Sequence, residues 1–138
     1  MPLFSCAGKR PDALGVSGAR LAPCSSSPNC VSSDAQDALH RVEPIAFDAP
    51  PAQAFSAARE AVAALPRCRI VDERDDYLHA ECTSALMGYV DDLELHLRPT
   101  DGAIAVRSAS RLGYSDMGVN RRRVEALRGA LALQKVAR

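Results

Sequence analysis

The sequence predicts a single α+β domain with the element order β-α-β-β-β-β-α, in which two helices pack on one face of an antiparallel sheet. Three observations carry this prediction. The chain has 138 residues, enough for one hydrophobic core but short for two full domains. Apolar residues recur every three or four positions in two segments, which is typical of amphipathic helices. Between those segments they alternate with polar residues, which is typical of half-buried strands.

The first third of the chain differs in composition from the rest. Residues 1–43 are rich in Pro, Gly, Ser, Asn and Asp and show no sustained periodicity, so we expect an irregular N-terminal arm that lies over the domain. We expect the α+β domain itself to span residues 44–138. Its first strand is predicted at 45–48, and Pro50 and Pro51 end it.

Two amphipathic helices are predicted. The first spans residues 52–65, where Pro51 suits the first turn, Pro66 ends the helix, and the apolar positions are Phe55, Ala58, Val62 and Leu65. The second spans residues 119–136, with an apolar side formed by Val124, Leu127, Ala130 and Leu131. A sheet with one apolar face needs one cover, which the two helices supply.

Four strands are predicted between the helices. Turn signals separate them at Asp75-Asp76, at Met87-Gly88 and at residues 99–102. The predicted strands are residues 68–74, 77–85, 89–98 and 103–112. This order of elements is similar to the helix-grip and TATA-box-binding-protein-like architectures, a likeness of fold that implies nothing about function.

The strand register follows from matching apolar residues across each hairpin. If paired residue numbers add up to 201 in the last hairpin and to 175 in the middle one, one face of the sheet is apolar throughout. The 201 register places Glu94 opposite Arg107. The 175 register gives two further pairs, His79 with His96 and Glu81 with Glu94. The other face is then polar, with His79, Glu81, Thr83, Asp92, Glu94, His96, Arg107 and Arg111.

The charges exclude some classes of protein. The 17 Lys and Arg residues balance the 17 Asp and Glu residues, so the chain lacks the overall basic field of a non-specific nucleic-acid binder. No run approaches the ~18 apolar residues of a membrane span. Lys9, Arg10 and Asp12 stand where a signal peptide would need an apolar region. The chain as written is therefore expected to be cytoplasmic.

The net charge of zero is the sum of an acidic region and a basic region of the chain. Residues 67–98 carry 4 cations and 8 anions, and residues 99–138 carry 8 cations and 3 anions. These regions are neighbours in the predicted sheet, so we expect them to pair electrostatically.

Two stretches carry a resemblance to a known family. The first, residues 23–33, reads PCSSSPNCVSS, and the second comprises residues 90–94, 106–121 and 123–125. They resemble the bacterial and plastid family catalogued as domain of unknown function 1499, over residues 14–131. The resemblance implies no activity, because the family has none established, and the family includes exported members. The structural signature that it implies comprises Cys24, Asn29, Cys30, Ser32, Asp92 and Glu94.

Three consecutive arginines, Arg121 to Arg123, stand at the predicted start of the last helix, where the positive end of the helix dipole disfavours cations. One interpretation is an ion-pair network with acidic residues of the neighbouring strands. The other is an anion site, in which the helix start helps to hold a phosphate or carboxylate. The candidate residues for that site are Arg107, Ser110, Arg111, Asp116, Asn120 and Arg121.

Two further groups of residues admit other chemistry. The patch of His79, Glu81, Glu94 and His96 offers ligands for a transition metal, whereas a solvated polar face is the simpler interpretation. Cys24 and Cys30 would close a small loop in an oxidising compartment and remain thiols in a cytosol. Cys82 falls on the apolar face, so we expect it in the core.

The sequence therefore predicts a non-enzymatic binding domain whose partner is a protein or a small anionic ligand, and it predicts no cofactor. The alternative is a thiol- or metal-dependent enzyme that uses Cys24 and Cys30 or the histidine and glutamate patch. Nucleic-acid binding through Arg121 to Arg123 is not expected, because no aromatic platform accompanies them.

Overall fold

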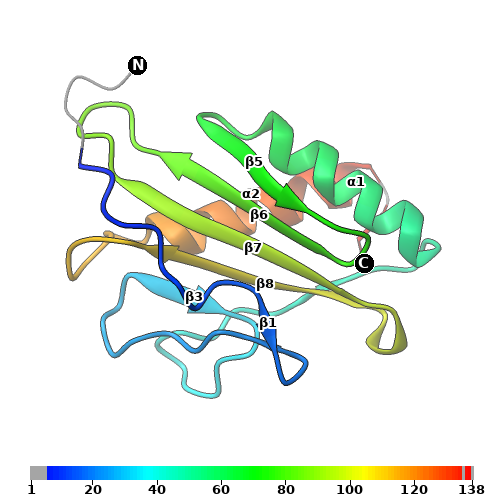
Figure 1. Ribbon diagram of the computed structural model, residues 1–138. Helices are drawn as coiled ribbons and strands as arrows, with labels where there is room; N and C mark the ends of the chain where they lie inside the picture. Colours follow the sequence, from blue (N-terminus) through cyan, green and yellow to red (C-terminus); the bar gives the residue numbers. More distant parts are fainter. Residues whose placement is uncertain (1–5, 135, 138) are drawn as a thin grey trace.

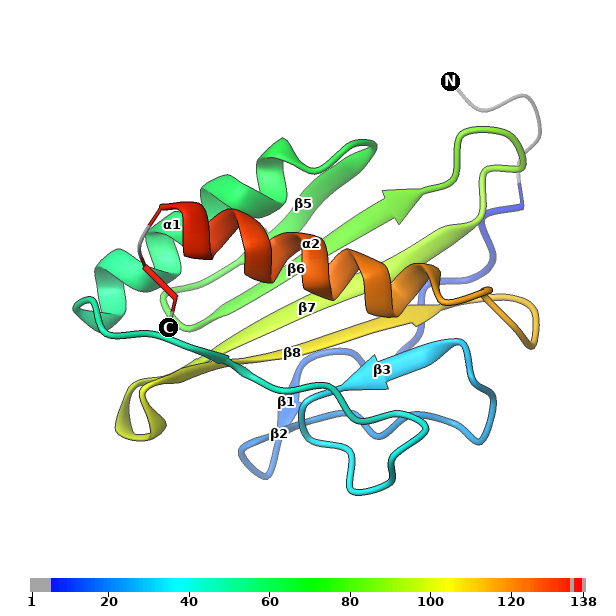
Figure 2. The same ribbon diagram turned by 180° about the vertical axis from the view of Figure 1, so that it is seen from behind.

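The computed structural model describes residues 6–134, 136 and 137 and has two layers (Figure 1). One layer is a sheet, and the other is a pair of helices lying across one of its faces (Figure 2). From residue 45 onward the elements are β4 (Ile45–Ala46), α1 (Pro51–Ala64), β5 (Cys68–Glu73), β6 (Tyr77–Thr83), β7 (Val90–Arg98), the 3-10 turn η1 (Pro99–Asp101), β8 (Ala103–Ser110) and α2 (Val119–Leu133). The predicted fold class and element order are confirmed.

The N-terminal arm contains more regular structure than the sequence predicted. Its described residues form β1 (Val16–Ser17) and β2 (Arg20–Leu21), which pair with each other, and β3 (Cys30–Ser32), which pairs antiparallel with β8. Strands of two or three residues leave no periodic pattern to detect. Figure 1 shows the first part of the arm crossing the sheet face that is turned away from the helices.

The described residues contain a six-stranded antiparallel sheet in the order β3-β8-β7-β6-β5, with β4 pairing on β8 as well. Its helix-facing side carries the hydrophobic core. Phe55 and Val62 of α1 and Leu127 of α2 are at most 2% exposed against the strand residues. The strand residues of this core include Leu78, Ala80, Leu93, Leu95, Ile104 and Val106.

The predicted register is right in one hairpin and wrong in the other. β7 and β8 pair with residue numbers adding up to 201, so Glu94 lies opposite Arg107 as predicted. In β6 and β7 the numbers of paired residues add up to 173, not to the predicted 175. The prediction assumed a two-residue turn at Met87-Gly88, whereas the loop closes further out, where the backbone N–H of Ser84 donates to Tyr89 O. A shift of two keeps every side chain on its predicted face.

The shift changes the pairs on the polar face. His79 lies opposite Glu94, and Glu81 lies opposite Asp92. The predicted pairs of His79 with His96 and of Glu81 with Glu94 are therefore wrong.

Cys82 is in the core as predicted, at 2% exposed, but it is not a thiol there. It forms a disulfide with Cys68, the residue opposite it on β5. The pairing was missed because Cys68 was considered only as a strand residue.

Candidate functional site

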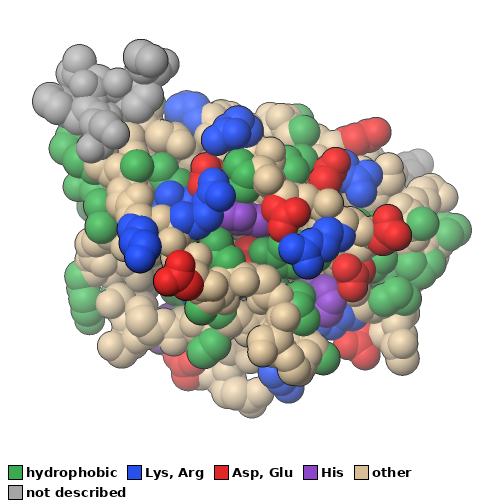
Figure 3. All heavy atoms as spheres, in the orientation of Figure 1, with side chains coloured by type: hydrophobic (Ala, Val, Ile, Leu, Met, Phe, Trp, Pro, Cys, Tyr) green, Lys and Arg blue, Asp and Glu red, His purple; other side chains and the backbone are tan. Residues whose placement is uncertain are grey.

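The polar face of the sheet lies beneath the N-terminal arm (Figure 1). Its predicted polar residues are present but largely buried, with His79, Asp92 and Glu94 at 5%, 1% and 0% exposed. A buried charge is costly unless it is paired and hydrogen-bonded. Figure 3 shows this face with acidic and basic side chains interspersed rather than separated by sign. The partners of each buried group therefore decide what the face can do.

Four residues on this face form a cluster centred on Arg111, which we call the Arg111 cluster: Arg111, Asp92, Glu81 and His79. The Arg111 guanidinium donates from Nε to Asp92 Oδ2 at 2.8 Å and from Nη2 to Asp92 Oδ1 at 2.8 Å, and Nη2 also donates to Glu81. His79 Nε2 lies 2.7 Å from Asp92 Oδ1. Arg10 reaches down from the arm to Glu81 at 2.6 Å. Burial acts to raise the pKa of Asp92, but hydrogen bonds from Arg111 and His79 outweigh it and lower that pKa.

Glu94, the most deeply buried acid, is held separately from the Arg111 cluster. Its Oε2 accepts hydrogen bonds from the Tyr77 hydroxyl at 2.5 Å and from the Gly15 backbone N–H of the arm at 2.7 Å. The predicted pair with Arg107 is present at 3.5 Å. Burial and the bond to Glu94 raise the pKa of Tyr77. Tyr77 was missed from the polar face, although alternation with His79 and Glu81 places it there.

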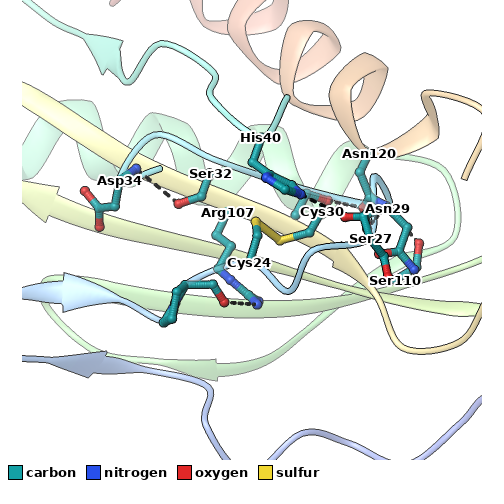
Figure 4. The surroundings of a disulfide bond; sticks show 12 residues. Cys24, Ser27, Asn29, Cys30, Ser32, Asp34, His40, Arg107, Ser110 and Asn120 are labelled. Carbon is teal, nitrogen blue, oxygen red and sulfur yellow. Dashed lines mark hydrogen bonds between the residues drawn. A yellow bond between two sulfur atoms is a disulfide. The ribbon is translucent and has the colours of Figure 1, made fainter. Parts of the chain in front are cut away.

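The Cys24–Cys30 disulfide closes the arm segment that carries the signature residues (Figure 4). Arg107 Nη2 donates to Pro23 O at 3.3 Å, beside the disulfide. His40 hydrogen-bonds to Ser27 O at 2.9 Å and to Asp37 at 2.6 Å. The Asn29 amide donates to Gly113 O at 2.7 Å. The signature arm is therefore attached to the sheet and to the segment after β8.

Asn120, which is fully buried at the start of α2, joins these pieces. Its Nδ2 donates to Asn29 O at 3.2 Å and to Ser110 Oγ at 2.9 Å, and also to Asp116. Its Oδ1 accepts from Ser108 Oγ at 2.6 Å and from Arg123 at 2.8 Å. Asp116 in turn caps the helix through the Asn120 backbone N–H at 2.9 Å. Every polar atom of the Asn120 side chain thus has a partner.

The six candidate anion-site residues fall into three places. Arg107 and Arg111 lie on the arm-covered face with their acidic partners. Ser110, Asp116 and Asn120 meet at the start of α2. Arg121 donates outward to Leu39 O and Arg41 O, both at 3.0 Å. Alternate residues of a strand point to opposite faces, so Ser110 and Arg111 diverge.

The predicted metal patch is also divided. Glu94 is hydrogen-bonded to Tyr77, and His96 lies 3.7 Å from Asp76 on the rim of the sheet. The residues that do come together are His79, Glu81 and Asp92, whose ligand atoms lie within 4.8 Å of one another. The Arg111 guanidinium bridges the two carboxylates of this set, so a fixed cation of the chain already neutralises them.

The arm forms an open cavity of about 660 Å³ between the β1–β2 hairpin and residues 32–37, which we call the arm pocket. Its wall is largely apolar, with Leu21, Ala22, Pro23 and the disulfide residue Cys24. Asp34 lies at its edge, where it accepts two hydrogen bonds from Arg98, at 2.6 and 2.7 Å, and one from the Leu21 N–H. No sequence pattern indicates this pocket, because it depends on how the arm folds back on itself.

The fold and this arrangement define a class: a small α+β domain whose polar sheet face is covered by a disulfide-closed N-terminal arm. The chain belongs to the family described as protein of unknown function, DUF1499, whose model matches residues 20–131. Both signature stretches lie within that range, so the resemblance seen in the sequence is confirmed. No curated protein and no solved structure matches the chain. None of the described helices is long and apolar enough to cross a membrane.

Proposed function

We propose that the protein is a non-enzymatic ligand-binding domain, and that the arm pocket takes a small molecule with an apolar body and an anionic group. The observation that carries this proposal is the cavity of about 660 Å³ with its apolar wall. Ligand pockets of proteins typically measure about 300–1,000 Å³ and are mostly apolar with a few polar groups.

The charges around the arm pocket favour an anionic rather than a cationic group. Asp34 is already neutralised by the two-pronged contact from Arg98, which together with the Leu21 N–H lowers its pKa. The Asp37 carboxylate is hydrogen-bonded to the His40 ring. Arg20 at the edge is 61% exposed and lies 3.9 Å from Asp34, the longest ion-pair distance in the described residues. Arg20 is therefore the group best placed to turn toward a ligand carboxylate.

Calorimetric titration with straight-chain carboxylates from butanoate to decanoate tests the proposal. We expect the affinity to rise about fourfold for each added methylene, since burial of one contributes about 0.8 kcal/mol, until the pocket is filled. The ammonium compound of the same length as octanoate is expected to bind more weakly. Arg20→Gln should weaken octanoate binding at least tenfold.

Two variants control this experiment. Arg74→Gln removes an arginine of similar exposure, also paired with one aspartate, from outside the arm pocket, so it should leave binding unchanged. Ala22→Phe narrows the pocket and should abolish binding of the longer chains while an unchanged thermal midpoint shows that the fold persists. Absence of binding by every carboxylate, or equal loss in Arg20→Gln and Arg74→Gln, would overturn the proposal.

The alternative, a thiol- or metal-dependent enzyme, has less support. Cys24 and Cys30 are joined in a disulfide, and Arg111 bridges the carboxylates beside His79. Elemental analysis of the purified protein tests the metal form of this alternative: a stoichiometric transition metal lost in His79→Ala would favour it over the ligand-binding proposal.

A further inference from the structure

Exposed apolar side chains gather at one end of the molecule. Of the nine large apolar side chains that are exposed in the described residues, six lie in the β6–β7 loop or between β8 and the first turn of α2. Met117 is 84% exposed and Tyr114 is 70% exposed. We call this set the loop end: Leu86, Tyr89, Leu112, Tyr114, Met117 and Val119. Single exposed apolar residues are ordinary, but a group of this kind marks an interaction site.

The two loops of the loop end are neighbours. The Arg111 N–H donates to Val90 O, which continues the β7–β8 pairing by one position toward both loops. Figures 1 and 2 both show the two loops projecting at the same end of the sheet. In Figure 3 apolar side chains follow that edge of the molecule. The two loops that carry the six exposed side chains therefore lie at one end of the molecule.

The chain enters its described part at this same surface. The Cys6 N–H donates to Met87 O, and a side chain at Gly8 would meet Leu112 at 2.9 Å. The described start of the chain therefore lies against both loops of the loop end.

Cationic side chains outnumber acidic ones at the loop end. Among the described loop residues the acid is Asp116, an ionised carboxylate whose oxygens accept hydrogen bonds from the Gly118 and Asn120 N–H groups at the helix start. Arg122 is exposed and donates to Met117 O at 2.9 Å, beside the apolar tip. Arg67 reaches the end of β6, where it donates to Thr83 O. An anionic surface would complement this end.

We propose that the loop end docks on the surface of an anionic lipid bilayer. Leu, Met and Tyr side chains flanked by arginine are the combination that enters the headgroup layer, with apolar atoms below and cations at the phosphates. Side chains on separate loop tips need no matching shape in a bilayer, whereas a protein partner needs a complementary surface of about 800 Å². The proposal is independent of the arm pocket.

The test uses vesicles of phosphatidylcholine with one quarter phosphatidylglycerol, and vesicles of phosphatidylcholine alone, in a sedimentation assay of the full chain. We expect the chain to bind the anionic vesicles more tightly, with binding reduced by salt. Leu112→Ser combined with Met117→Ser should weaken binding at least tenfold. Arg122→Gln should weaken it about fivefold, which corresponds to about 1 kcal/mol for one cation near the surface.

The chain contains no tryptophan, so one introduced tryptophan reports its own surroundings. Met117→Trp should give blue-shifted emission on anionic vesicles, with quenching by brominated lipids. Leu133→Trp, at an equally exposed position at the far end of α2, should give neither. Thermal midpoints confirm that each variant folds.

Three results would overturn the proposal. These are absence of binding to anionic vesicles at low salt, an equal spectral shift at positions 117 and 133, and self-association abolished by the Leu112 and Met117 changes without vesicle binding. The last result would identify the loop end as an interface between copies of the chain. None of them bears on carboxylate binding in the arm pocket.

Discussion

At the scale of single residues, Asn120 shows how a buried polar group can organise this fold. Its side chain has five hydrogen bonds, to Asn29, Ser108, Ser110, Asp116 and Arg123. These residues come from the arm, from β8 and its following segment, and from α2. A fully satisfied buried network favours one arrangement of its elements, because any other leaves polar atoms unpaired.

Replacement of Asn120 should therefore be costly. Asn120→Ala leaves Asn29 O, Asp116 and Ser108 short of partners, and we expect the free energy of unfolding to fall by about 2–4 kcal/mol. Urea unfolding at neutral pH measures the change. Gln53→Ala removes an exposed amide from α1 and should alter stability by less than about 0.5 kcal/mol. A loss in Asn120→Ala as small as this control would show that solvent or neighbours replace the network.

At the scale of elements, the two disulfides fix different connections. Cys68–Cys82 joins β5 to β6 in the core, whereas Cys24–Cys30 closes a short loop of the arm. A disulfide restricts the unfolded chain more when the loop it closes is longer. The core disulfide, which spans 14 positions in sequence against 6 for the arm disulfide, should therefore contribute more to stability.

Removing each pair measures these contributions. We expect a loss of about 3 kcal/mol for Cys68→Ala with Cys82→Ala, and of about 2.4 kcal/mol for Cys24→Ser with Cys30→Ser. Hydrogen exchange should increase around the arm pocket in the second variant and leave β5 and β6 protected. Cys6→Ser, which changes the free cysteine, is the control. An arm that remains equally protected without Cys24–Cys30 would show that its hydrogen bonds alone hold it.

At the scale of the whole molecule, the zero net charge reflects internal pairing between an acidic and a basic region. Arg111 and Arg107 on the last strand and its extension pair with Asp92, Glu81 and Glu94 of the middle strands. Arg123 of α2 pairs with Asp91 on the helix side, at 2.8 Å. Charges on both faces of β7 are thus matched by the basic end of the chain.

This pairing predicts a pH-dependent stability. Burial raises the pKa values of Asp92 and Glu81, but their arginine contacts outweigh it, so both values lie below the ordinary 3.8 and 4.5. A carboxylate with a lowered pKa stabilises the fold above its ordinary pKa, and this contribution is lost as the pH falls through the lowered value. At neutral pH, Arg111→Gln should therefore lower the free energy of unfolding by about 3 kcal/mol.

The difference in the free energy of unfolding between the original chain and Arg111→Gln should shrink below about pH 4, where Asp92 and Glu81 become protonated. Chemical unfolding of both proteins at neutral pH, near pH 5 and near pH 3 measures this difference. Arg74→Gln, which removes an exposed pair with Asp72, should show a difference of at most about 1 kcal/mol at neutral pH. A difference for Arg111 that does not change with pH would mean that the side chain acts through packing alone.

Prediction from the sequence succeeded where the signal was local. Apolar positions three or four residues apart located both helices, and alternation placed Asp92, Glu94 and Arg107 on one face, since these patterns need only neighbouring residues. It failed for the register between β6 and β7, where paired residue numbers add up to 173 and not to 175. Two registers that differ by two residues place every side chain on the same face, so the apolar pattern does not distinguish them. The candidate anion site was predicted from residues that are close in sequence. Neighbouring residues of a strand point to opposite faces, so Ser110 and Arg111 do not share a site.

The sequence by itself determined the α+β class, the order of the elements, the face on which each strand residue lies, and the family. Only the tertiary structure decided that Cys68 pairs with Cys82, that Arg111 neutralises Asp92 and Glu81, and that the arm folds into a pocket. These contacts join residues far apart in the chain, up to 91 positions for Asn29 and Asn120. Such contacts form only after packing brings the elements together, so no local periodicity encodes them.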